Sequence, residues 1–115
     1  MEIGFFGLSH LGLNYLAANA CKGHKVIGYD RDNKLIKDLT LGKKLFKEPF
    51  LFENLDKYKK NIKFTNNLKD LKKFKIVFIS SDVKTDSKGK SNLKFIKRDI
   101  NSLRKVLFDK NLIIM

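Results

Sequence analysis

The sequence has little cysteine and proline and no tryptophan: one Cys, one Pro and no Trp among 115 residues. The single cysteine, Cys21, excludes an internal disulfide, so a packed core has to provide the stability. Cys21 falls on the small-residue face of a predicted first helix. We therefore expect a buried, unreactive thiol there, not a nucleophile or a metal ligand.

Long apolar runs are also missing. No stretch approaches the roughly 20 apolar residues that a membrane span needs, and no basic region precedes a hydrophobic signal segment at the N-terminus. We therefore expect a cytoplasmic protein with no membrane partner. The hydrophobic fraction of 43% is enough for a packed core, and the length predicts one domain, residues 1–115, short for a two-part α/β enzyme.

Arginine is scarce although the chain is strongly basic. The net charge is +13, and of 25 basic residues three are arginine and the other 22 are lysine. Surfaces that read phosphates and bases favour arginine for its bidentate fork, and these lysines are spread along nearly the whole chain. Asn, Ile and Phe are abundant too, as an AT-rich genome would encode. We interpret the lysines as solvated surface and predict no nucleic-acid partner.

The first thirty residues are the most informative. An apolar strand (residues 2–6) leads into a glycine turn (residues 7–12), a small-residue helix follows to Lys22, and a second strand (residues 25–30) ends on Asp30. A dinucleotide pyrophosphate needs close backbone N–H donors and the positive end of a helix. An acidic residue about twenty positions later holds the ribose hydroxyls, and Asp30 lies 18 residues after Gly12.

The turn departs from G-x-G-x-x-G at its middle position, where Ser9 stands. Because a Cβ there limits backbone approach to the pyrophosphate, we expect Ser9→Gly to tighten dinucleotide binding or leave it unchanged. A glycine turn that serves only the fold is the alternative. The predicted cofactor-binding residues of this segment are Gly7, Leu8, Ser9, His10, Leu11, Gly12 and Asp30.

Strands and helices alternate along the rest of the chain. Helices are expected over residues 33–41, 50–58, 68–74 and 93–108, strands over residues 62–64, 75–80 and 111–115, and polar loops over residues 43–49 and 81–91. This pattern predicts a Rossmann-type α/β fold. Its doubly wound parallel sheet has about five strands with flanking helices, in the order 3-2-1-4-5, and is incomplete at the C-terminus.

Four segments in this order resemble the N-terminal domain of the UDP-glucose/GDP-mannose dehydrogenases: residues 4–13, 22–30, 48–49 and 86–89. The resemblance runs over residues 1–115. It implies NAD as cofactor and an enzyme that oxidises the C6 alcohol of a nucleotide sugar to a carboxylate in two hydride transfers. The family's cofactor contacts carry over to Gly7, Gly12 and Asp30.

Two departures from that family are visible. Phe50 stands where a glycine usually follows the Glu48-Pro49 pair. A Gly-Thr-Pro-Thr-like turn beside the cofactor is replaced by residues 82–85, of which Thr85 alone matches. Thr85 is therefore a predicted cofactor contact, and a merely solvated loop is the alternative for residues 81–90.

The family's nucleophilic cysteine, catalytic lysine and sugar-binding residues lie beyond the first domain. Cys21 does not match the nucleophile's motif, and His10 and His24 lie in a turn and a loop. We predict no catalytic residue and no metal site, a truncated chain that is inactive alone, and nucleotide-sugar binding only with the missing domains.

A non-catalytic or vestigial nucleotide-binding domain is one alternative function. A β-hydroxyacid-type dehydrogenase is another, although the Glu-Pro pair argues against it.

Two further expectations concern partners. A carboxylate at Asp30 accepts hydrogen bonds from a free 2′-hydroxyl and repels a 2′-phosphate, so NAD is preferred over NADP, although Arg31 offsets part of that repulsion. Residues 111–115 begin an apolar strand at the edge of the sheet. Because an open apolar edge pairs with other strands, we expect self-association through it, or fraying of that strand.

Overall fold

The computed structural model describes residues 1–80, 94–105 and 112–114. The strands are β1 (Glu2–Phe6), β2 (Lys25–Tyr29), β3 (Ile62–Thr65), β4 (Ile76–Ile79) and β5 (Leu112–Ile114). The helices are α1 (His10–Cys21), α2 (Asn33–Thr40), α3 (Leu51–Lys57) and α4 (Lys94–Arg104), with short 3-10 helices η1 (Lys59–Asn61) and η2 (Leu68–Lys73). The predicted elements are confirmed within the described ranges. The loop over 81–91 and the outer residues of the last helix and strand lie outside those ranges.

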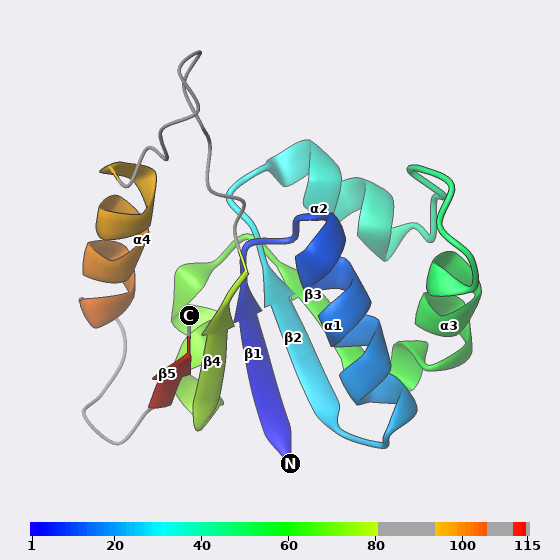
Figure 1. The fold of residues 1–115 in the computed structure, drawn as a ribbon, viewed down its shortest axis with the longest axis horizontal. Coiled ribbons are helices and arrows are strands. Elements are labelled where there is room, and N and C mark those ends of the chain that lie inside the picture. Colours follow the sequence, from blue (N-terminus) through cyan, green and yellow to red (C-terminus); the bar gives the residue numbers. More distant parts are fainter. Residues whose placement is uncertain (81–93, 106–111, 115) are drawn as a thin grey trace.

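The five strands form one parallel sheet in the order β3-β2-β1-β4-β5 (Figure 1). The predicted order is therefore confirmed. The chain leaves β1 for β2 on one side and later returns to place β4 on the other side. Strand order thus reverses at β1, and in such sheets ligands bind at that switch point, outside the carboxyl ends of the strands. The turn that leads from β1 into α1 lies at this place.

Alternating side chains on the strands build two hydrophobic cores, one on each face of the sheet. On one face Ile3 and Phe5 of β1 and Val26 of β2 pack with apolar residues of α1, α2 and α3. On the other face Phe6 and Ile27 pack with residues of η2, β4 and α4. Helices on both faces are the feature that defines a doubly wound sheet.

β5 is an edge strand among the described residues, with β4 as its neighbour. Its predicted position is confirmed. Self-association through this edge stays a prediction.

The expected burial of Cys21 is wrong. Cys21 is exposed, while the buried positions of α1 are Gly12, Leu13, Leu16, Ala17 and Ala20. These recur at helical spacing and form one stripe against the sheet. Cys21 follows Ala20 by one residue, which turns it about 100° away from that stripe at 3.6 residues per turn.

Candidate cofactor site

The turn after β1 is shaped by glycines at its two ends. Gly7 has φ +97°, a left-handed conformation that glycine adopts without steric cost, and its N–H donates to the Tyr29 carbonyl of β2 at 2.8 Å. Position 12 requires a glycine because no space is left there for a side chain. A Cβ at this position would lie 2.6 Å from the Gly7 carbonyl oxygen and 2.8 Å from Ser80 Oγ. The glycines therefore allow α1 to begin directly against the end of β1.

The backbone N–H groups of this turn divide into satisfied and unsatisfied donors. Ser9 is the N-cap of α1: its hydroxyl accepts from Gly12 N at 3.1 Å, and its carbonyl accepts from Leu13 N at 2.9 Å. Among the described residues, no acceptor is recorded for the N–H groups of Ser9, His10 and Leu11. Donors without an acceptor in the described part of the chain, at the positive end of a twelve-residue helix, make a site for an anion.

Asp30 stands beside these donors at the end of β2. One carboxylate oxygen accepts from Leu8 N at 2.9 Å and the other from Asp32 N at 3.0 Å. These two bonds hold the carboxylate at the turn, and its remaining lone pairs are available for hydroxyl donors. A pyrophosphate at the start of α1 and a ribose at Asp30 are the two parts of a dinucleotide that this arrangement fits.

The side chain of His10 connects the turn to the loop over residues 43–50. His10 Nε2 lies 3.3 Å from Glu48 Oε2, and the imidazole meets the Phe46 ring edge-on with centroids 3.8 Å apart. Glu48 belongs to the Glu-Pro pair that the sequence singled out. Phe50, which stands in the place of the family's glycine, has φ +64°.

Sequence reasoning missed Ser80, the residue after β4. Its hydroxyl donates to the Gly7 carbonyl at 2.6 Å, and its carbonyl accepts from Ser9 Oγ at 2.6 Å. The available signal was its place at the carboxyl end of the strand that neighbours β1. Of the predicted site residues, the structure brings together those of residues 7–12 and Asp30, whereas Thr85 lies outside the described residues.

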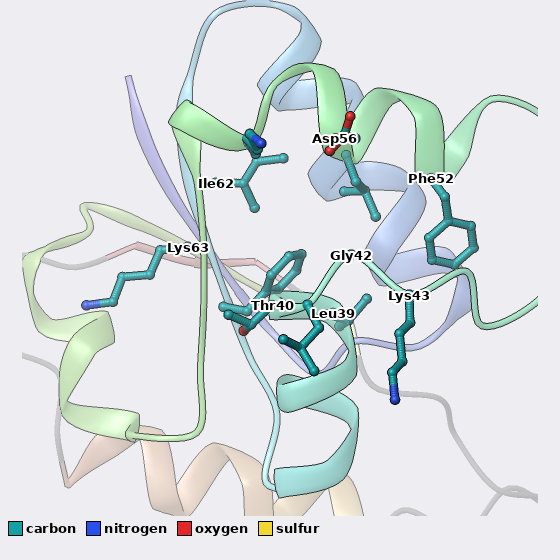
Figure 2. Close-up of a pocket in the computed structure, with 12 residues that line it drawn as sticks. Leu39, Thr40, Gly42, Lys43, Phe52, Asp56, Ile62 and Lys63 are labelled. Carbon is teal, nitrogen blue, oxygen red and sulfur yellow. The ribbon is translucent and has the colours of Figure 1, made fainter.

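A separate cavity of about 400 Å³ lies against the outer strand β3 (Figure 2). Its walls come from the end of α2, from α3 and from the start of β3, including Thr40, Phe52 and Ile62. Neither the turn over residues 7–12 nor Asp30 lines it, so it is distinct from the candidate cofactor site.

The described ranges contain neither a metal-binding cluster nor a membrane-spanning helix. In residues 1–80, 94–105 and 112–114, no three His, Cys, Asp or Glu side chains gather in a group that could hold a metal ion. Within the same ranges, no helix is long and apolar enough to cross a membrane.

The chain is similar to parts of several longer proteins. An uncharacterized protein of Methanocaldococcus jannaschii is 27% identical over 108 residues, 93% of this chain and 12% of that protein. The structure of UDP-D-ManNAc dehydrogenase from Pyrococcus horikoshii is similar with a TM-score of 0.89 at 25% identity, over 98% of this chain and 27% of that one. GDP-mannose dehydrogenase from Pseudomonas aeruginosa, solved as a ternary complex, has a TM-score of 0.83 at 24% identity, over 90% and 24% of the two chains.

The chain therefore spans 12% to 27% of the length of these three proteins. A sequence model of the UDP-glucose/GDP-mannose dehydrogenase family, NAD binding domain, matches residues 1–115. The glycine turn, the start of α1 and Asp30 fit the cofactor named in that description. Because the match covers the whole chain, the chain belongs to the UDP-glucose/GDP-mannose dehydrogenase family, as its NAD-binding domain.

Proposed function

We propose that this chain is the cofactor-binding portion of an enzyme that oxidises the C6 alcohol of a nucleotide sugar, of the UDP-glucose or GDP-mannose type, to a carboxylate. The observation that carries the proposal is the pair formed by the N–H donors at the start of α1, which have no acceptor within the described residues, and the carboxylate of Asp30 beside them. The similarity of the chain to the P. horikoshii dehydrogenase supports the same reaction class. A cytoplasmic location is part of the proposal, and cell fractionation tests it.

Each residue has a defined part in this site. The N–H groups of Ser9, His10 and Leu11 donate to the pyrophosphate, and Asp30 accepts from the adenosine ribose hydroxyls. Gly7, Leu8 and Gly12 shape the turn, and Thr85 supplies a further contact. Bound NAD supplies the acceptor for a hydride. The groups that bind and activate the sugar are proposed to lie outside residues 1–115, so this chain alone is inactive.

Titration calorimetry with NAD and NADP tests the cofactor assignment. We expect NAD to bind more tightly, because the Asp30 carboxylate repels a 2′-phosphate. Asp30→Asn removes that charge and should bring the two affinities to within about tenfold of each other, because NADP is no longer repelled and NAD loses a charge-assisted hydrogen bond. Asp56→Asn is the matched control, because Asp56 is an exposed aspartate that forms no part of this site. NADP binding as tight as NAD binding in the parent chain would overturn the assignment.

The same titration separates this proposal from a vestigial domain. A parent chain that binds neither dinucleotide favours a glycine turn that serves only the fold. The β-hydroxyacid alternative loses its support, because the family match over residues 1–115 is to the nucleotide-sugar enzymes.

A further inference from the structure

Two serine hydroxyls join the glycine turn to the end of β4. Ser9 Oγ donates to the Ser80 carbonyl at 2.6 Å, and Ser80 Oγ donates to the Gly7 carbonyl at 2.6 Å. We call Ser9 and Ser80 the serine clasp. The two residues are 71 positions apart in the sequence, and each hydroxyl donates to a backbone carbonyl of the other segment. Neither bond depends on the other serine's side chain, so the two can be removed separately.

The clasp also controls the start of α1. Ser9 Oγ accepts from Gly12 N while it donates to Ser80, so one hydroxyl connects the first turn of the helix to the neighbouring strand. Ser80 fills the space beside Gly12, where an added Cβ would meet Ser80 Oγ at 2.8 Å and Ser80 Cβ at 3.1 Å. Gly7, Gly12 and the two serines therefore interlock at the point where strand order reverses.

The Ser9 hydroxyl is engaged in this junction. The middle position of the motif is where a side chain would be expected to keep backbone and pyrophosphate apart. Here that side chain is turned toward Ser80, and the N–H groups of His10 and Leu11 keep no recorded acceptor among the described residues. The serine thus occupies the motif's middle position while those donors remain available to an anion.

We propose that Ser9 and Ser80 are positioning residues for the pyrophosphate, fixing the turn so that the N–H groups of His10 and Leu11 converge on one anion. This inference rests on the proposed cofactor site. The motif alone led us to expect that Ser9→Gly tightens dinucleotide binding or leaves it unchanged. The positioning role predicts the opposite, because loss of the Ser9 hydroxyl should weaken dinucleotide binding.

The test compares a ligand that carries the pyrophosphate with one that lacks it. NAD and adenosine are titrated against the parent chain, Ser9→Ala, Ser80→Ala and Ser9→Thr. Each alanine variant should lower the affinity for NAD between about two- and tenfold, the range for one lost hydrogen bond. Adenosine affinity should be unchanged, because adenosine reaches Asp30 without using the turn's donors. Ser9→Thr keeps a hydroxyl that serves as an N-cap and should therefore bind NAD more tightly than Ser9→Ala does.

Thermal unfolding of each variant is measured alongside, and Ser80→Ala carries the test if Ser9→Ala does not fold. A variant that loses affinity for NAD and adenosine by the same factor would show a general loss of structure and overturn the positioning role. Unchanged NAD affinity in both alanine variants would overturn it as well, while leaving the proposed function intact. A parent chain that binds no NAD would overturn both.

Discussion

The turn over residues 7–12 and the loop over residues 43–50 each contain a residue in the left-handed conformation, but the type of residue at that position differs. The turn uses Gly7, at φ +97°, and the loop uses Phe50, at φ +64°. Glycine adopts this region freely, whereas an L side chain places its Cβ too close to the neighbouring backbone, at a cost of about 1–2 kcal/mol. The left-handed backbone is therefore unstrained at Gly7 and strained at Phe50.

The packing around Phe50 explains how the strain is held. Phe50 as a whole residue is 75% exposed, so its own burial offsets little of the cost. The next two residues, Leu51 and Phe52, are only 2% and 8% exposed. Phe50 is the N-cap of α3, and its carbonyl accepts from Asn54 N at 2.9 Å. Burial of the first turn of α3 therefore dictates the backbone at Phe50. A strained residue persists where its neighbours are fixed in this way.

The largest effect is expected from breaking the unstrained region. Gly12→Val places a Cβ against the Gly7 carbonyl and Ser80 Oγ, at 2.6 and 2.8 Å. We expect loss of NAD binding and about 3 kcal/mol less unfolding free energy, the upper end for overpacked sites. Calorimetry and urea unfolding measure the two effects. Ala18→Val is the matched control, because Ala18 is exposed on the same helix and tests the helix propensity of valine alone. Normal NAD binding by Gly12→Val would show that this turn is not the phosphate site.

The contrast between these regions also shows what the sequence was able to predict. Local patterns located β1, β2 and the end of α1 to within one residue, although α1 begins at His10, inside the predicted turn. The Asp32 side chain caps α2, accepting from Lys34 N and Leu35 N. These features depend on residues close together in the chain, where periodicity and capping rules apply.

Features made by distant segments were missed. The two bonds of the serine clasp connect hydroxyls to backbone carbonyls more than 70 residues away, and no spacing rule encodes such a contact. Phe50 was recognised as a departure from a glycine, but its conformation follows from how α3 packs. The burial of Cys21 was predicted wrongly because small neighbours suggested a buried face, while the helix had already turned that position outward.

The next largest effect should come from relieving the strained region. Phe50→Gly removes the Cβ from a left-handed residue and should raise the unfolding free energy by about 1 kcal/mol relative to Phe50→Ala. The comparison with alanine matters, because both variants lose the exposed ring and only the glycine loses the Cβ. Urea unfolding of the pair measures the difference. Equal stability of the two variants would mean that the backbone at this position relaxes when the ring is removed.

The smallest effect concerns the contact between His10 of the turn and Glu48 of the loop. His10 and Glu48 lie 3.3 Å apart, but their side chains are 56% and 33% exposed, and solvent-exposed pairs contribute about 0.2–1 kcal/mol. A double-mutant cycle with His10→Gln and Glu48→Gln, measured by urea unfolding at pH 5.5, should give a coupling energy in that range. The coupling should shrink between 0.05 and about 0.5 M salt, because exposed charges are screened. The packing of the imidazole on Phe46 is lost in both His10 variants and cancels in the cycle, so a coupling energy near zero would assign the link between turn and loop to the ring contact.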